Sequence, residues 1–102
     1  MKLIHDMKGG LLTVRLEGEL DHHSAADCRT TLDEILGDNP EIRQLRVNLC
    51  GLKFMDSSGI GVLIGRYKVI RERKGVMTLY GMNPAVGRIV EMAGLKKIMN
   101  VE

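Results

Sequence analysis

The chain has 102 residues, a length typical of one domain with a single modest core. Hydrophobic residues make up 44% of the chain and aromatic residues only 3%, with no Trp, so the core must be built from aliphatic side chains and Met. The formal net charge is +2 with acidic and basic residues interspersed, which argues against a nucleic-acid-binding or membrane-binding surface; the scarcity of aromatic rings argues against a platform for stacked bases.

A β-hairpin is predicted at the N-terminus. Residues 3–7 form a weakly patterned strand, and the Lys-Gly-Gly sequence at 8–10 is typical of a turn. Residues 11–16 alternate apolar and polar side chains, which indicates a second strand. A polar loop at residues 17–23 follows.

The first helix is expected to begin at Ser24, which can cap its N-terminus, with Asp27 three residues on as in a capping box. Gly37 ends this helix because the Asp-Asn-Pro sequence at 38–40 forbids its continuation. The helix has an apolar stripe made of Ala25, Cys28, Leu32, Ile35 and Leu36. A third strand is predicted at about residues 42–49.

The centre of the chain, residues 54–61, reads Phe-Met-Asp-Ser-Ser-Gly-Ile-Gly and joins the third strand to a second helix. That helix is predicted from Ser57 or Ser58 to about residue 74. Asp56, Ser57 and Ser58 are all residue types that cap helix N-termini. The glycines that follow keep side-chain bulk away, so that another protein can approach closely.

The C-terminal third continues the alternation of strand and helix. A fourth strand is predicted at residues 76–80. Asn83 caps a third helix with Pro84 in its first turn, and Gly94 ends it. Residues 95–101 are predicted as either a short helix or an edge strand.

Together these elements predict an α/β fold for a single domain, residues 1–102, with a mixed, mostly parallel β-sheet of four to five strands. Residues 45–49 alternate apolar and polar side chains, so we expect helices mainly on one face of the sheet. Partners of such sheets meet the carboxyl ends of the strands. Residues 19–24 and 56–59 both follow strands, and they form one surface if those strands are neighbours.

Two enzymatic interpretations are disfavoured by motif. Met55 and Asp56 stand where a Gly-x-Ser-x-Gly nucleophile elbow needs its first glycine, so serine hydrolysis is not indicated. Gly59, Gly61 and Gly65 lack the spacing of a phosphate-binding loop. We instead expect Gly61 and Gly65 to pack closely against a neighbouring strand or helix.

A metal site is also disfavoured. His22 and His23 are adjacent and expected to point in different directions, and no Cys or further His completes a ligand set. Cys28 falls on the apolar helix face and Cys50 at a strand end, and both are predicted to be reduced thiols. The N-terminus has no apolar run typical of a signal peptide, so the protein is predicted to be cytoplasmic, with no membrane contact.

The two serines leave two interpretations open: one of them caps the helix, or one of them, Ser57 or Ser58, accepts a phosphate. A phosphate would bring about −1.5 to −2 charges to a helix N-terminus. Free backbone N–H groups and the helix dipole tolerate an anion there. Because Asp56 and Asp21 already make the proposed surface acidic, we expect repulsion of a docked partner rather than refolding.

Three segments resemble the anti-sigma factor antagonists of the STAS domain family, and within it those of sporulation. They are GELDHHSA at residues 18–25, FMDSSGIGVLIGRYK at 54–68, and NPAV at 83–86 followed by Gly-Leu at 94–95. The resemblance covers the chain in order and implies a binding protein, not an enzyme. It implies that the unmodified chain binds an anti-sigma factor and thereby frees a sporulation sigma factor.

The resemblance also implies how binding is switched. The anti-sigma factor would be a serine kinase, holding ATP and Mg itself, that phosphorylates Ser57, and a serine phosphatase would reset the chain, which carries no cofactor. The partner-binding residues implied are Asp21, His22, His23, Asp56, Ser57, Ser58 and Gly59. The alternatives are an antagonist serving a general stress-response sigma factor and a nucleotide-binding STAS module.

Overall fold

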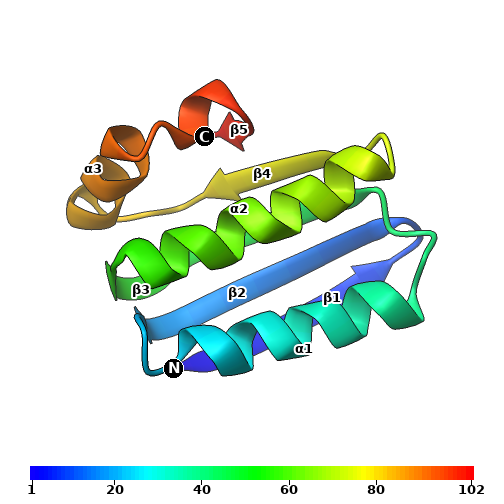
Figure 1. Cartoon of the computed structure of the whole chain (residues 1–102), viewed down its shortest axis with the longest axis horizontal. Coiled ribbons are helices and arrows are strands. Elements are labelled where there is room, and N and C mark those ends of the chain that lie inside the picture. The colour runs from blue at the N-terminus through cyan, green and yellow to red at the C-terminus, as the bar shows by residue number, and fades with distance from the viewer.

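The computed structural model describes residues 1–102. It contains five strands, three α-helices and one 3₁₀ helix (Figure 1). In chain order these are β1 Lys2–Lys8, β2 Leu11–Leu20, α1 Ala25–Asp38, β3 Gln44–Met55, α2 Ser57–Glu72, β4 Val76–Tyr80, α3 Pro84–Met92, η1 Leu95–Lys97 and β5 Asn100–Val101.

The strands form one sheet in the order β1-β2-β3-β4-β5. β1 and β2 pair antiparallel as a hairpin, and every other neighbouring pair is parallel. α1 links β2 to β3 and α2 links β3 to β4, and both helices lie side by side on the same face of the sheet (Figure 1). The predicted fold class is therefore confirmed.

The core lies between the sheet and these helices. It is one cluster of 22 buried apolar side chains, which follows from the alternation along the central strands. The inward side chains of β2 and β3 are at most 1% exposed and include Leu12, Val14, Leu16, Leu45, Val47 and Leu49. The opposite face carries polar side chains that pair with one another, such as Arg15 with Glu17 at 2.7 Å.

β2 and β3 are both longer than the sequence predicts. β2 continues past residue 16 to Leu20, and β3 runs to Met55 instead of ending near residue 49. The extensions pair with each other through register shifts at Arg15/Glu17 and Gly18/Glu19, which interrupt the apolar alternation. Cys50 consequently lies within β3 and is exposed, not at a strand end.

The C-terminal end of α1 is closed by contacts that local sequence does not reveal. Gly37 lies inside the helix, which ends at Asp38, one residue beyond the predicted stop. The Asn39 side-chain amide donates to the Ile35 carbonyl at 2.8 Å. The Arg73 guanidinium, from beyond α2, donates to the carbonyl oxygens of Leu36, Asn39 and Ile42. These hydrogen bonds satisfy carbonyl groups at the end of α1 and just beyond it that have no partner within the helix.

The glycines near α2 have different environments. A Cβ atom added at Gly59 would lie 2.6 Å from the Leu20 carbonyl oxygen, so Gly59 allows α2 to touch β2. Nothing lies within 4 Å of a Cβ atom at Gly61 or Gly65. The expectation that these two glycines are closely packed is wrong, because the buried line of α2 passes through Gly59, Val62, Leu63, Arg66 and Ile70 instead.

The remaining elements follow the predictions closely. β4 has the predicted bounds, and the Asn83 side chain accepts from the Val86 N–H at 2.8 Å, which confirms this cap of α3. Gly94 ends that helical segment with φ +74°. Residues 95–101 contain both expected alternatives, the 3₁₀ helix η1 and the edge strand β5. No helix has the length and apolar composition needed to cross a membrane.

Candidate functional site

The loops that follow β2 and β3 meet at one end of the sheet. β2 and β3 are parallel neighbours, and Leu20 pairs with Met55 at their carboxyl ends. The His22 N–H donates to Asp56 Oδ2 at 3.2 Å, and the Asp56 N–H donates to the Leu20 carbonyl at 3.3 Å. The two loops therefore form one surface, as the sequence predicts.

Asp56 is the residue that caps α2. Its Oδ1 accepts from the N–H groups of Ser58, at 2.8 Å, and Gly59, at 3.3 Å. The interpretation in which a serine caps this helix is therefore wrong: Asp56 has the extended backbone of an N-cap, and Ser57 is already helical. The Asp56 carboxylate also occupies N–H groups that the sequence leaves free for a phosphate.

Ser57 and Ser58 point to different surroundings. Ser57 is exposed, and its hydroxyl makes no hydrogen bond within the protein. Ser58 is half-buried and lines a cavity of about 430 Å³ between the first turns of α1 and α2. Neither hydroxyl is hydrogen-bonded to a side chain that could act as a base toward it.

Asp21 organises the turn between β2 and α1. Its Oδ1 accepts from the His23 N–H at 2.9 Å and from the Ser24 N–H at 3.2 Å. Partial desolvation opposes ionisation of Asp21, but these backbone hydrogen bonds outweigh it and hold the pKa of Asp21 below its usual value. The Asp21 carboxylate is therefore charged throughout the physiological pH range.

Ser24 does not cap α1 as predicted. Its backbone is already helical, with φ −104° and ψ −15°, and no cap hydrogen bond forms. Its hydroxyl instead donates to the Glu19 carbonyl at 2.8 Å and accepts from the Asp21 N–H at 3.1 Å, which ties the turn back to β2. The capping-box prediction fails because the turn residue Asp21, not Ser24, supplies the side-chain acceptor.

The two histidines are exposed, and their rings lie together. The ring centroids of His22 and His23 are 3.9 Å apart with the planes tilted by 38°, so the expectation that they point in different directions is wrong. The tight turn folds adjacent residues to one side, whereas an extended strand would alternate them. No group of three or more His, Cys, Asp or Glu side chains is placed to hold a metal ion.

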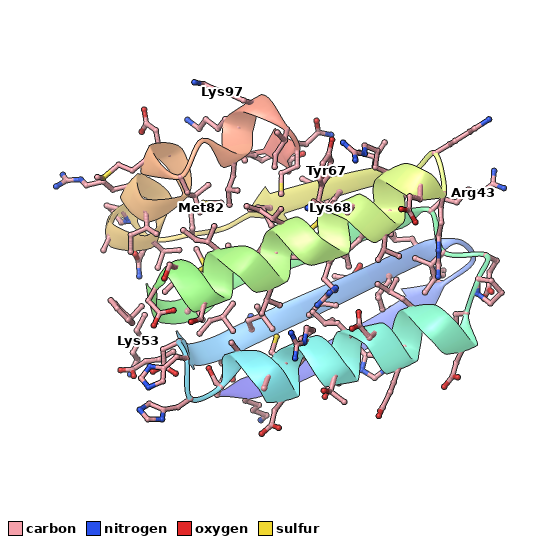
Figure 2. All side chains as sticks on the ribbon, in the orientation of Figure 1. Arg43, Lys53, Tyr67, Lys68, Met82 and Lys97 are labelled. Carbon is pink, nitrogen blue, oxygen red and sulfur yellow. The ribbon has the colours of Figure 1, made fainter.

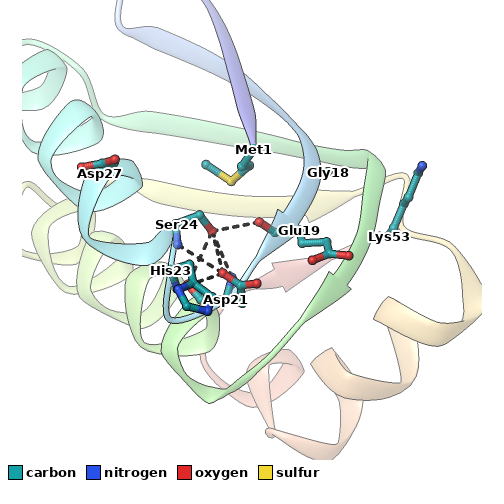
Figure 3. A pocket seen from close by; sticks show the side chains of 8 residues that line it. All are labelled: Met1, Gly18, Glu19, Asp21, His23, Ser24, Asp27 and Lys53. Atoms are coloured by element: carbon teal, nitrogen blue, oxygen red, sulfur yellow. Dashed lines mark hydrogen bonds between the residues drawn. The ribbon is translucent and has the colours of Figure 1, made fainter.

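A second, acidic cavity of about 570 Å³ lies on the other side of this turn (Figure 3). Asp21 and Glu19 stand on one wall and Asp27 of α1 on the other, with the Met1 side chain between them. Met1, Asp27 and Lys53 also line this cavity, and no local sequence pattern indicates this. Met1 reaches it because the residue packs beside Gly18. This cavity has the charge to receive a basic side chain.

Residues 4–102 match the STAS domain family. The chain belongs to the STAS domain family. This STAS protein is 45% identical over 92 residues to an anti-sigma F factor antagonist of Paenibacillus polymyxa, covering 90% of this chain and 78% of that relative. It is 31% identical over 88 residues to an anti-sigma-B factor antagonist of Staphylococcus aureus, covering 86% and 80%.

The structure of the STAS protein is similar to that of the Bacillus cell fate determinant SpoIIAA in its phosphorylated form, with a TM-score of 0.76 and 26% identity. That similarity covers 99% of this chain and 91% of SpoIIAA. The predicted resemblance to the anti-sigma factor antagonists of this family is thus confirmed. The segments at residues 18–25 and 54–68, which carry that resemblance, contain the ends of β2 and β3 and the starts of α1 and α2.

Proposed function

We propose that the STAS protein, acting as one domain, is an anti-sigma factor antagonist of sporulation whose unmodified form binds an anti-sigma factor. The observation that carries this proposal is the exposed hydroxyl of Ser57, which makes no hydrogen bond within the chain and follows Asp56, the residue that joins the two loops. Two relatives that cover most of the chain are antagonists of anti-sigma F and anti-sigma-B factors. Binding of the anti-sigma factor to this surface would release its sigma factor.

We further propose that phosphorylation of Ser57 switches binding off. The anti-sigma factor itself would act as the serine kinase, with ATP and Mg bound to it, and a serine phosphatase would reverse the modification. Because the Asp56 carboxylate already accepts from the N–H groups of Ser58 and Gly59, those donors cannot neutralise a phosphate. The added charge of about −1.5 to −2 would instead join Asp56 and Asp21 on a surface that the partner covers.

The fold is expected to survive this modification. The Ser57 hydroxyl makes no hydrogen bond within the protein, so a phosphate would break none. Its effect would be repulsion and steric conflict at the interface, and these act on affinity rather than on folding. SpoIIAA, which has the same fold, has been solved in a phosphorylated form.

A second candidate is an antagonist in a stress-response pathway. The observation that favours it is the 31% identity with the anti-sigma-B factor antagonist over 88 residues. The same docking surface and the same switch would serve both candidates. They are distinguished by which purified anti-sigma factor of the organism binds the chain in calorimetric titration.

The test of the switch is phosphorylation followed by titration. Incubation of the chain with the anti-sigma factor and ATP, then peptide mass spectrometry, should place one phosphate on Ser57. The purified phosphoprotein should bind the ADP-loaded anti-sigma factor at least about tenfold more weakly than the unmodified chain, a change of about 1.4 kcal/mol or more. Ser58→Ala is the matched control and should still be phosphorylated. A phosphate found only on Ser58, or equal affinities of both forms, would count against the switch.

A further inference from the structure

A groove runs between α1 and α2 away from the serines. Its outer part is the cavity of about 430 Å³ that Ser58 lines. Its lining includes three small residues, Ala25 and Ala26 of α1 and Gly61 of α2, and two basic residues, His22 and Arg29. The cavity lining contains no carboxylate.

Gly61 of α2 lines this groove, and no contact within the chain requires a glycine at position 61 or at position 65. Gly61 and Gly65 have helical backbone, and a Cβ atom at either position would touch nothing within 4 Å. Glycine inside a helix lowers its stability relative to alanine. Gly61 and Gly65 therefore lower the stability of α2 and leave its outer surface free of side-chain bulk. A partner that approaches α2 closely would require such a surface.

An incompletely paired charge lies on α2 one turn beyond Val62, the last residue of α2 that lines the groove. Ser58, Val62 and Arg66 follow one another at i, i+4 and i+8 along α2, so Arg66 continues the line that faces α1. Arg66 is only 7% exposed, and its Nε lies 3.1 Å from Asp33 Oδ1 of α1. The contact between Arg66 and Asp33 is an ion pair whose geometry does not make a hydrogen bond. Nε and Nη1 of Arg66 are buried and have no hydrogen-bond acceptor.

A buried guanidinium with unsatisfied donors is unfavourable unless an acceptor reaches it. Asp33, the acidic partner of Arg66, is half-exposed, so solvent or a docked group can reach its side of the pair. The groove thus combines low side-chain bulk with two basic side chains in its lining, and spare guanidinium donors lie one turn of α2 beyond it. A carboxylate is the group that matches all three.

We propose that this α1–α2 groove receives a carboxylate-bearing segment of the anti-sigma factor; this inference rests on the proposed function. The cavity on the other side of the β2–α1 turn is lined by three carboxylates, those of Glu19, Asp21 and Asp27, against one lysine, Lys53. The docking surface therefore carries opposite charges on its two sides. A partner with a basic group facing Asp21 and an acidic group facing Arg29 binds in one orientation only.

The first arm of the test reverses charge in the groove. Arg29→Glu should weaken binding of the anti-sigma factor at least about tenfold at about 0.1 M salt, and the loss should shrink at higher salt because screening weakens the repulsion. Lys97→Glu is the control, since it makes the same change of net charge on η1, on the other side of α2 from α1 (Figure 2). It should leave the affinity within about twofold of the wild-type value.

The second arm fills the groove without changing charge. Gly61→Gln should raise the midpoint of thermal unfolding by about 4 °C, because glutamine is a better helix former, yet weaken binding at least about tenfold. The single change Arg66→Lys, which keeps a cation beside Asp33 but presents three N–H donors instead of five, should weaken binding while circular dichroism shows the fold intact. Wild-type chain that fails to bind the anti-sigma factor would overturn the proposed function. If the wild-type chain binds, and Arg29→Glu and Gly61→Gln bind as tightly as Lys97→Glu, the proposed function stands. Only the proposal that the groove receives a carboxylate is then overturned.

Discussion

At the scale of single residues, Asp56 joins the cap of α2 to the turn before α1. Its carboxylate accepts from Ser58 and Gly59 within α2 and from His22 across the surface. One side chain therefore both starts a helix and fixes the position of the neighbouring loop. This explains how Ser57 can be exposed and unbonded and still be held in one place.

We predict that Asp56→Ala lowers the free energy of unfolding by about 1–2 kcal/mol, the usual cost of losing an N-cap. Urea titration monitored by circular dichroism measures this change. Ser57→Ala should stay within about 0.5 kcal/mol of wild type because its hydroxyl bonds to nothing in the chain. Equal losses in the two variants would contradict the assignment of the cap to Asp56.

At the scale of elements, the contact between α2 and β2 depends on the absence of a side chain. The Leu20 carbonyl and the Met55 side chain both lie within 2.7 Å of where a Cβ atom at Gly59 would be placed. The first turn of α2 can sit over the ends of β2 and β3 only if residue 59 is glycine. Gly65, two turns later, meets no such restriction.

Gly59→Ala should therefore cost about 2–3 kcal/mol of stability through overpacking against backbone. Gly65→Ala should add about 0.5–1 kcal/mol, because it improves helix propensity in open space. Chemical denaturation of both variants beside the wild type provides the measurement. A stabilised Gly59→Ala variant would mean that α2 does not approach β2 as closely as the structure shows.

At the scale of the whole molecule, one core serves both the sheet and the helices. Cys28 belongs to that core, whereas Cys50 lies exposed on the open face of the sheet. Burial raises the pKa of the Cys28 thiol to about 11, and the nearby Arg66 opposes this only in part. Reaction of the Cys50 thiol is therefore expected in the folded protein, whereas reaction of the Cys28 thiol requires the core to open.

Iodoacetamide at pH 8 should modify Cys50 in the folded protein and Cys28 only after global unfolding, at least about a thousandfold more slowly. Mass spectrometry should find one adduct in buffer and two in denaturant, and Cys50→Ser isolates the slow thiol. Because the folded pKa of Cys28 is raised above its ordinary 9.0, its contribution to stability is complete below pH 9 and declines as the pH rises toward about 11. Fast labelling of Cys28 in buffer would show that the core opens locally.

Local sequence patterns determined the type and order of the elements. The alternation along residues 45–49 predicted a sheet covered by helices mainly on one face, and Asn83 with Pro84 predicted the start of α3. Both predictions succeed because periodicity and helix capping act within a few residues. The resemblance of three segments to the STAS antagonists, confirmed by comparison, came from the same linear information.

Contacts between distant residues were decided only by the tertiary structure. The long ends of β2 and β3 exist because each strand supplies hydrogen bonds to the other, and α1 ends where Arg73 reaches its carbonyl groups. The choice of Asp56 over the serines as cap depends on the β3–α2 junction meeting the turn at His22. The groove beside Gly61 exists because α2 packs on the sheet with a different side, so that Gly61 stays at the surface. No local sequence pattern determines which side of α2 is buried.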